Sequence, residues 1–211
     1  MIFKYEQSNF HEHESYKERN LYYKYFAAYY FNELVPGYDK RREKYFLILN
    51  HVLNNSEKFK GNIEQARRVI EYFRQEKPFV TFDYHSSQVI DDDKRNDRGE
   101  MSDILFWIKK AFISVECKFL SDISFEKDIR EVQDRIIKVS SRFDVEPLQI
   151  LLITKANWEG TYRQRNKESS FYSRFQKADV LVPVLILLWE DLLNVTDDAT
   201  VKSYLTAQLK R

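Results

Sequence analysis

The chain has 211 residues, of which 43% are hydrophobic and 32% are charged, as in an ordinary globular protein of one domain with a sizeable core. Its 34 basic and 33 acidic side chains give a formal net charge of +1, so overall charge neither indicates nor excludes a nucleic-acid partner. Only four glycines and four prolines are present, which excludes a low-complexity chain and favours long regular elements.

The single cysteine and the apolar runs indicate the cellular setting. Cys117 cannot form an internal disulfide, and it stands in an apolar strand pattern where a buried thiol is common. Residues 1–16 lack the apolar run of a signal peptide, and the run over 180–189 is too short to cross a bilayer. We therefore expect a soluble, cytoplasmic protein with no membrane partner.

Residues 1–60 are predicted to form an N-terminal helical subregion. Ser15 and Glu18 make a capping-box pair for a first helix, and Asp39 is expected to cap a second helix that runs through about Asn55. Nine of the 14 tyrosines lie within residues 1–45. They could stack on nucleic-acid bases, but packing is the commoner role of an aromatic helix face.

The next forty residues contain a helix, a strand and an acidic loop. A third helix is predicted from Asn62 to about Glu76 because apolar residues recur every three or four positions, at Ile63, Ala66, Ile70 and Phe73. A strand rich in β-forming residues follows over 79–85. The loop over 86–100 carries three consecutive aspartates but lacks the spacing and glycine of a calcium loop, so we interpret it as a solvated loop.

The remaining chain alternates helices and strands. After a hairpin over 102–119, a helix is predicted within 122–143, strands over 147–154 and 180–189, and an amphipathic helix at the C-terminus. Helices on both sides of strands in this order predict an α/β fold with a mixed β-sheet flanked by helices.

The hairpin, with the sequence SDILFWIKKAFISVECKF, consists of two apolar strands around Lys109 and Lys110. If these lysines form a two-residue turn, Ile108 lies opposite Ala111. Counting outward along the two strands then places Asp103 opposite Glu116, and directly opposed Cβ atoms lie about 4.5–5.5 Å apart.

Glu116 and Lys118 are two positions apart on one strand, so their side chains point to the same face. Two carboxylates, from Asp103 and Glu116, would repel each other unless a cation lies between them. Mg²⁺ prefers oxygen ligands and often combines one or two carboxylates with substrate phosphate oxygens. The metal can activate a water molecule, and Lys118 can orient that water or stabilise negative charge. A solvated hairpin edge, in which Lys118 only relieves the repulsion, is the alternative.

These residues resemble the PD-(D/E)XK nuclease superfamily, whose fold is restriction-endonuclease-like. Asp103 resembles its first acid, and Glu116-Cys117-Lys118 resembles its (D/E)xK element, with a helix before and a helix after; the resemblance covers residues 61–155. It implies a restriction-endonuclease-like core over residues 61–211 with an N-terminal helical extension. It also implies catalytic roles for Asp103, Glu116 and Lys118, of which the two acids bind Mg²⁺, with Mn²⁺ able to substitute.

Some positions depart from the superfamily pattern or extend it. Ser102 replaces the proline of the motif's name, and Ile137 replaces the tyrosine of the Gln-x-x-x-Tyr element of the RecB-like branch, four positions after Gln133. Members often add an acid from the first core helix. Glu64 is the candidate for that additional acid, with Glu71 as the substitute.

Basic side chains after the strand over 147–154 are candidates for holding DNA. They are interleaved with aromatic residues, as on surfaces that track phosphates and stack on bases, although part of this segment also forms an apolar helix stripe. The candidates are Lys155, Arg163, Arg165, Lys167 and Arg174.

The sequence thus predicts a Mg²⁺-dependent endodeoxyribonuclease that hydrolyses phosphodiester bonds, of the restriction and defence type or of the repair type. DNA is the expected partner, and a homodimer would suit double-strand cleavage because that reaction needs two cuts. The alternative is a catalytically inactive nuclease-like fold that serves as a nucleic-acid-binding or protein-interaction module.

Overall fold

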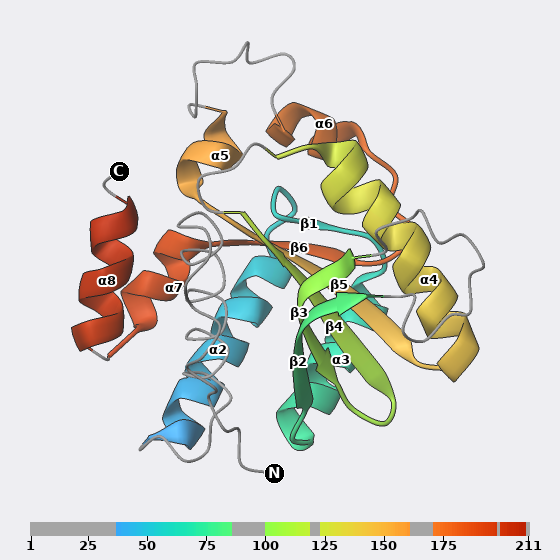
Figure 1. The fold of residues 1–211 in the computed structure, drawn as a ribbon, viewed down its shortest axis with the longest axis horizontal. Coiled ribbons are helices and arrows are strands. Elements are labelled where there is room, and N and C mark those ends of the chain that lie inside the picture. The colour runs from blue at the N-terminus through green and yellow to red at the C-terminus, as the bar shows by residue number, and fades with distance from the viewer. Residues whose placement is uncertain (1–36, 86–99, 119–122, 161–170, 198, 210–211) are drawn as a thin grey trace, which may run out of the picture.

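The computed structural model describes residues 37–85, 100–118, 123–160, 171–197 and 199–209 (Figure 1). The helix predicted to begin at Ser15 and most of the acidic loop lie outside these residues. Within the described part, the chain is an α/β fold built on a six-stranded mixed sheet with helices on both faces.

The strand order in the sheet is β1-β6-β5-β4-β3-β2. Strands β2, β3 and β4 form an antiparallel meander, β4, β5 and β6 are parallel, and β1 pairs antiparallel with β6. The strands are β1 (Phe59–Lys60), β2 (Phe79–His85), β3 (Glu100–Trp107), β4 (Ala111–Cys117), β5 (Glu146–Ile153) and β6 (Val184–Leu188). The predicted mixed sheet is confirmed.

One face of the sheet is covered by α2 (Tyr38–Leu53) and α3 (Ile63–Gln75). Their buried residues, such as Phe46 and Phe73, share a single cluster with alternate residues of β3 to β6. The helix α7 (Trp189–Val195) joins the same cluster through Trp189. The described part of the N-terminal subregion therefore packs directly on the sheet.

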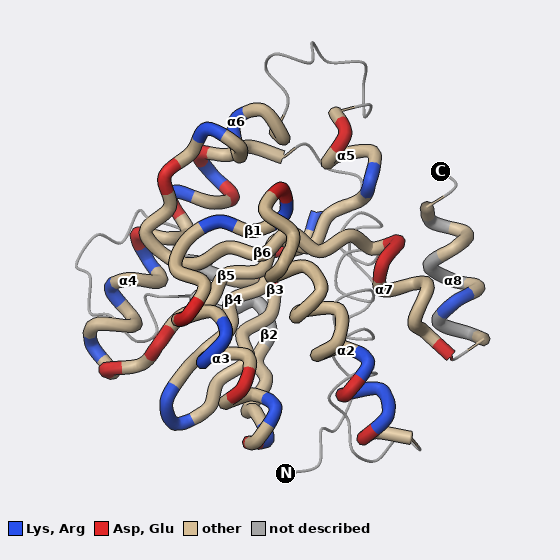
Figure 2. The backbone as a smooth tube through the Cα atoms, turned by 180° about the vertical axis from the view of Figure 1, so that it is seen from behind, with Lys and Arg blue, Asp and Glu red and all other residues tan. Residues whose placement is uncertain are grey.

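The other face is covered by α4 (Glu131–Phe143), α5 (Lys155–Glu159) and α6 (Phe171–Lys177). A π-helical turn, η3 (Glu126–Arg130), leads into α4, and Glu131 N–H donates to the Glu126 carbonyl five residues back. The last helix, α8 (Ala199–Leu209), lies beside α7, away from the sheet (Figure 1). Figure 2 shows that β6 carries no charged residue, whereas α2, α3 and α4 carry many.

Several helix boundaries follow from local chemistry. Asn62 caps α3, because its side-chain oxygen accepts a hydrogen bond from Gln65 N–H. The expectation that Asp39 caps the second helix is wrong. Gly37, in a left-handed conformation, is the N-cap of α2, and Asp39 lies inside the first turn, where its negative charge still favours the helix dipole.

The hairpin has the predicted register. Ile108 N–H donates to the Ala111 carbonyl across the two-lysine turn, and Ile104 pairs with Val115 at the far end of the registered ladder. The registered pairs end at Ile104 and Val115, one residue before Asp103 and Glu116.

Two strand ends differ from the prediction. Strand β6 begins at Val184 rather than near residue 180, directly after Pro183, which has no N–H to donate to a neighbouring strand. Trp189 begins α7 instead of ending the strand. In the described part of the chain, no helix combines the length and apolar character required to cross a membrane.

Candidate functional site

The carboxylate of Asp103 lies at the point where β3 and β4 stop pairing. Its Oδ2 accepts a hydrogen bond of 2.7 Å from Cys117 N–H, while the neighbouring Lys118 N–H donates to Leu152 on the opposite side of β4. The Asp103 side chain therefore takes the place of a backbone carbonyl on the β3 side of β4. Nearby, the buried hydroxyls of Ser102 and Ser114 are 2.6 Å apart and link the same two strands.

Glu116 and Lys118 lie on the sheet face that α4 covers, because Val115 and Cys117 point into the core on the opposite face. Lys118 Nζ is 2.6 Å from Glu116 Oε1 and 3.2 Å from Asp128 Oδ1. The three side chains expose only 18%, 12% and 11% of their surface for Lys118, Glu116 and Asp128, respectively. One ammonium group thus bridges two carboxylates in a largely buried position.

The electrostatic balance at Lys118 favours its charged form. Burial by itself lowers the pKa of the ammonium group, but the negative charges of Glu116 and Asp128 outweigh this effect and raise the pKa above its ordinary value. Asp103 contributes in the same direction. Lys118 is therefore a permanent cation at neutral pH, suited to stabilising negative charge and unsuited to acting as a base.

The thiol of Cys117, between Glu116 and Lys118, has low reactivity. Burial raises the pKa of its thiol well above the usual value, and the nearby carboxylates of Asp103 and Glu116 raise it further. Because the thiolate is the nucleophilic form, a thiol held protonated has little reactivity. The structure places Cys117 in the core, as expected from the strand pattern.

Asp128 is a member of this cluster that the sequence analysis missed. It is 8% exposed, lies in η3, and accepts a hydrogen bond of 2.6 Å from Ser124 N–H on its second carboxylate oxygen. A signal was present in the sequence. Asp128 is three residues after Phe125 and four before Val132, so it lies on the apolar stripe of its helix, where a charged residue needs a partner.

Buried amides connect Asp128 to the loop before β6. Gln149 of β5 donates to the Asp128 carbonyl, and Gln133 of α4 donates to the Gln149 side chain and to the Val182 carbonyl. The Gln133 oxygen in turn accepts from Leu181 N–H. These contacts satisfy both amides in the core and fix η3 against the sheet.

The structure does not bring Glu64 to this cluster. Glu64 is in the first turn of α3, which covers the opposite face of the sheet, and its neighbour Gln65 donates to the Pro147 carbonyl at the start of β5. Its exposed carboxylate pairs with Arg67 at 2.9 Å. Pro147 pairs with Phe112, which is about four residues, or about 13 Å, along β4 from Glu116. Glu64 therefore lies at the other end of the strands. Glu71, further along α3, pairs instead with Gln75.

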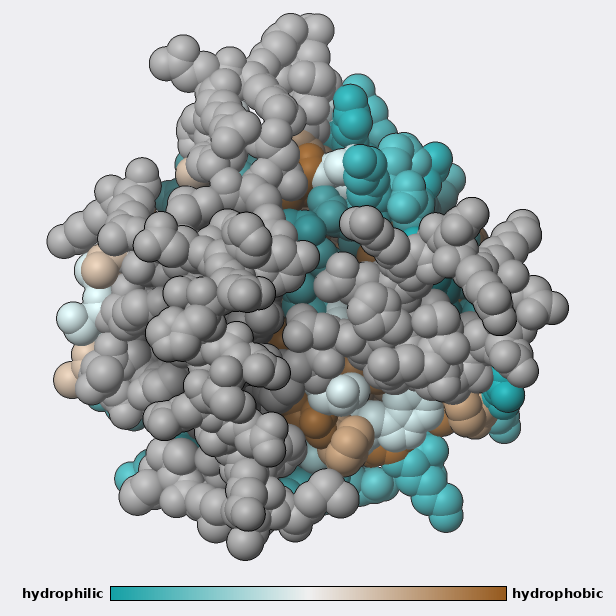
Figure 3. All heavy atoms as spheres, in the orientation of Figure 1, coloured by the Kyte–Doolittle hydropathy of each residue, from teal (hydrophilic) through white to brown (hydrophobic). Residues whose placement is uncertain are grey.

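Two candidate DNA-binding residues lie within the described chain. Lys155 directly follows the end of β5, at the same edge of the sheet as Lys118, because Cys117 pairs with Leu152 in parallel register. Its side chain is 60% exposed and its ammonium is 3.5 Å from Glu159. Arg174 is exposed on α6, where Figure 3 shows hydrophilic surface above α4. Arg163, Arg165 and Lys167 lie outside the described residues.

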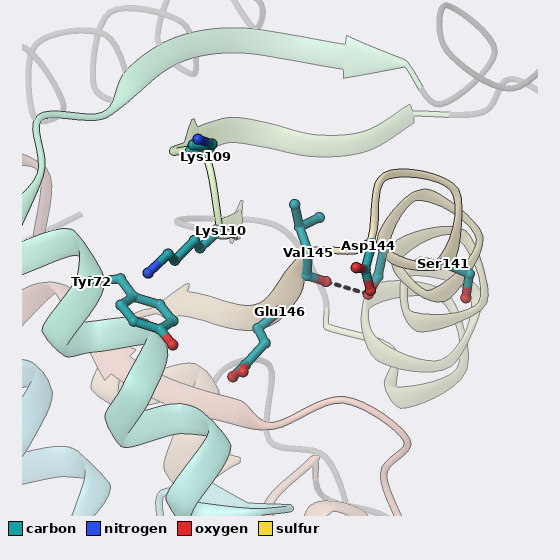
Figure 4. A pocket seen from close by; sticks show the side chains of 8 residues that line it. Tyr72, Lys109, Lys110, Ser141, Asp144, Val145 and Glu146 are labelled. Carbon is teal, nitrogen blue, oxygen red and sulfur yellow. Dashed lines mark hydrogen bonds between the residues drawn. The ribbon is translucent and has the colours of Figure 1, made fainter.

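A hollow of about 580 Å³ lies at the opposite end of the hairpin from Lys118 (Figure 4). Lys109 and Lys110 of the turn, Tyr72 of α3 and Glu146 of β5 line it, and Lys110 Nζ is 5.3 Å from the centre of the Tyr72 ring. Lys110 is six residues from Glu116, or about 20 Å along an extended strand. This hollow is therefore separate from the acidic cluster.

The cluster offers carboxylate oxygens but no complete metal site among the described residues. Among the residues that the structure describes, no group of three or more histidine, cysteine, aspartate or glutamate side chains is placed to hold a metal ion. The chain instead offers the carboxylates of Asp103 and Glu116 beside a fixed ammonium group, which leaves further coordination to water or substrate oxygens.

Comparison with known proteins assigns no family to the chain. No family model matches it, and no curated protein and no solved structure matches it either. The resemblance to the PD-(D/E)XK superfamily therefore rests on the hairpin residues and on the order of the surrounding elements.

Proposed function

We propose that this protein is a Mg²⁺-dependent endodeoxyribonuclease with a restriction-endonuclease-like core. The observation that carries the proposal is the position of Lys118, whose ammonium group is 2.6 Å from Glu116 at the end of β4, next to the Asp103 carboxylate at the end of the β3–β4 ladder. Acid, acid and lysine from two adjacent strands are the groups that the (D/E)xK pattern requires.

In the proposed reaction, Asp103 and Glu116 are the residues that would hold Mg²⁺. When bound, Mg²⁺ would supply an activated water and would neutralise negative charge on the phosphate. Lys118, a permanent cation, would orient the attacking water by donating a hydrogen bond and would stabilise the added negative charge. Lys155 and Arg174, whose side chains are exposed, are the proposed contacts to the DNA strand.

A second function is favoured by one specific observation. Lys118 Nζ contacts one carboxylate oxygen of Glu116, so the cluster as it stands is already neutralised in part. A chain that keeps this ion pair would be an inactive nuclease-like fold that binds nucleic acid or another protein. The two functions differ in whether a divalent ion displaces the ammonium from Glu116.

The deciding experiment is cleavage of supercoiled plasmid and of branched DNA with Mg²⁺ or Mn²⁺. Wild type is compared with Glu116→Ala and Lys118→Ala, and with Glu43→Ala, an exposed residue of α2 on the opposite face of the sheet, as a control. The endonuclease proposal expects metal-dependent nicking that both site variants lose and the control keeps. DNA binding without cleavage of either substrate would favour the binding module.

A further inference from the structure

Asp128 is held more firmly than the ion pair alone requires. One carboxylate oxygen accepts from Ser124 N–H at 2.6 Å, its own N–H donates to the Ser124 carbonyl at 2.8 Å, and its carbonyl accepts from Gln149 at 3.0 Å. The other carboxylate oxygen is left to face Lys118. The orientation of this oxygen is thus set by backbone and core contacts, independently of the lysine.

The local backbone also favours this placement. Asp128 lies in the π-helical turn η3, where the hydrogen-bond ladder is one residue wider than in α4. Such turns are rare and are found frequently at functional sites. Here the turn brings a carboxylate from the helix layer down to a strand residue, and Gln149, which extends from β5, supports the turn from below.

Asp128 can neutralise the Lys118 ammonium group in a state in which Glu116 cannot. A carboxylate that coordinates a divalent ion no longer neutralises a neighbouring ammonium group, and the ion repels that group. Lys118 is only 18% exposed, so it needs another anionic partner at that moment. Asp128 supplies one from η3, 3.2 Å from Lys118 Nζ.

We propose that Asp128 is a positioning residue that keeps the Lys118 ammonium group in place when Glu116 turns to a metal ion. The inference rests on the endonuclease proposed above and deepens it. It assigns Asp128 no contact with the metal or the substrate, because both of its oxygens face protein groups.

The test compares Asp128→Asn in two backgrounds, wild type and Lys118→Met. Asparagine keeps an acceptor for Ser124 N–H and removes only the charge. In plasmid nicking, we expect kcat to fall by about ten- to a hundredfold, as for a misplaced catalytic group, while the Mg²⁺ concentration for half-maximal rate and KM for DNA stay within about twofold. In the Lys118→Met background, the same substitution should not lower the residual kcat further. Asp134→Asn, which changes an exposed aspartate on α4, is the matched control. It should leave kcat, KM for DNA and the half-maximal Mg²⁺ concentration unchanged.

A stability cycle measured without DNA separates this inference from the proposed function. Urea unfolding of the same four proteins, with and without Mg²⁺, should show that Asp128→Asn raises the unfolding equilibrium constant of wild type about fivefold more than that of Lys118→Met. Where Asp128→Asn does not fold, Asp128→Glu, which moves the charge by one methylene, takes its place in both measurements. Failure of wild type to cut DNA would overturn the endonuclease, and the stability cycle would still decide whether Asp128 holds Lys118. An equal loss of kcat or of stability in both backgrounds would overturn the inference.

Discussion

Asp103 Oδ2 accepts a hydrogen bond of 2.7 Å from Cys117 N–H, so one carboxylate both closes the β3–β4 ladder and borders the proposed metal position. The two roles can be separated by substitution. Asp103→Asn keeps an oxygen for the N–H, whereas Asp103→Ala leaves that donor without its acceptor. We expect Asp103→Ala to lose about 1–3 kcal/mol of unfolding free energy, and Asp103→Asn clearly less.

Both variants should lose the response to metal, because both lose the negative charge. Thermal melts with and without Mg²⁺ are the measurement: the ion should raise Tm of wild type and have much less effect on either variant. Equal Tm shifts in all three proteins would place the metal elsewhere. Equal destabilisation of the two variants in urea would mean that the charge of Asp103, and not its hydrogen bond, stabilises the hairpin.

The raised pKa of Lys118 predicts how stability depends on pH. A lysine whose pKa is higher in the folded state than in the unfolded state, where it is about 10.4, stabilises the fold fully below that value and loses this contribution as pH rises through the folded-state value. Lys118→Met removes the titrating group. The difference in unfolding free energy between wild type and Lys118→Met should therefore be constant from about pH 7 to 9.5 and should change only above about pH 10.4.

Urea titrations at several pH values measure this difference, and the other lysines and tyrosines cancel in it. Lys109→Met, at the exposed hairpin turn, is the matched control. A difference that already changes between pH 7 and 9 would mean that Lys118 loses its proton early and that Glu116 and Asp128 do not hold its charge.

The buried amides of Gln133 and Gln149 should be energetically coupled. Gln133→Leu removes the acceptor of Leu181 N–H and a donor to Gln149, and Gln149→Leu removes the donor to the Asp128 carbonyl. Each substitution should cost about 2–3 kcal/mol, because it leaves buried polar groups unpaired. The double variant should cost less than the sum by about 1 kcal/mol, since the two amides share one hydrogen bond.

Urea unfolding of the two single variants and the double variant gives the coupling directly. Gln75→Leu, an exposed glutamine on α3, is the matched control and should stay within about 0.5 kcal/mol of wild type. Simple additivity of the two buried substitutions would contradict a shared network.

The sequence predicted those parts of the fold that depend on neighbouring residues. The apolar spacing from Ile63 to Phe73 predicted α3. The two-lysine turn predicted the hairpin register, because the turn type and loop length determine which residues of a hairpin pair. Asp103, Glu116 and Lys118 could be placed near one another for the same reason.

The missed parts depend on contacts between distant segments. Asp128 lies on the apolar stripe of its helix, which indicated burial, but no local pattern identified the π-helical turn or Lys118 on β4 as its partner. Glu64 was placed near the acids by analogy with the superfamily, but the packing of α3 on the opposite face takes it to the other end of the strands. Which face a helix covers is decided by the whole core, and hydrophobic spacing alone does not specify it.

Gly61, between β1 and α3, should be the glycine least tolerant of a side chain among those compared. Its φ of 104° lies in the left-handed region, and a Cβ there would approach the Pro183 Cα to 2.8 Å. Because that atom belongs to the backbone, it cannot move aside as a flexible side chain would. Gly37 also has a left-handed φ, of 80°, but the nearest atom to its Cβ would be Nη1 of the Arg41 side chain at 3.5 Å, an ordinary van der Waals contact. An alanine at either position would be in a strained left-handed conformation, but only at Gly61 would its Cβ also clash with the backbone.

Gly37→Ala should therefore cost about 1–2 kcal/mol, the price of a left-handed conformation for an alanine. Gly61→Ala should cost about 1–3 kcal/mol more, because it adds the overpacking against Pro183. Urea midpoints of the two variants provide the comparison. Since Pro183 begins the connection into β6 and its carbonyl accepts from Gln149 N–H, a displaced Pro183 would also disturb the strand that supports Asp128. Equal midpoints for the two variants would mean that β1 and the Pro183 loop can separate without cost.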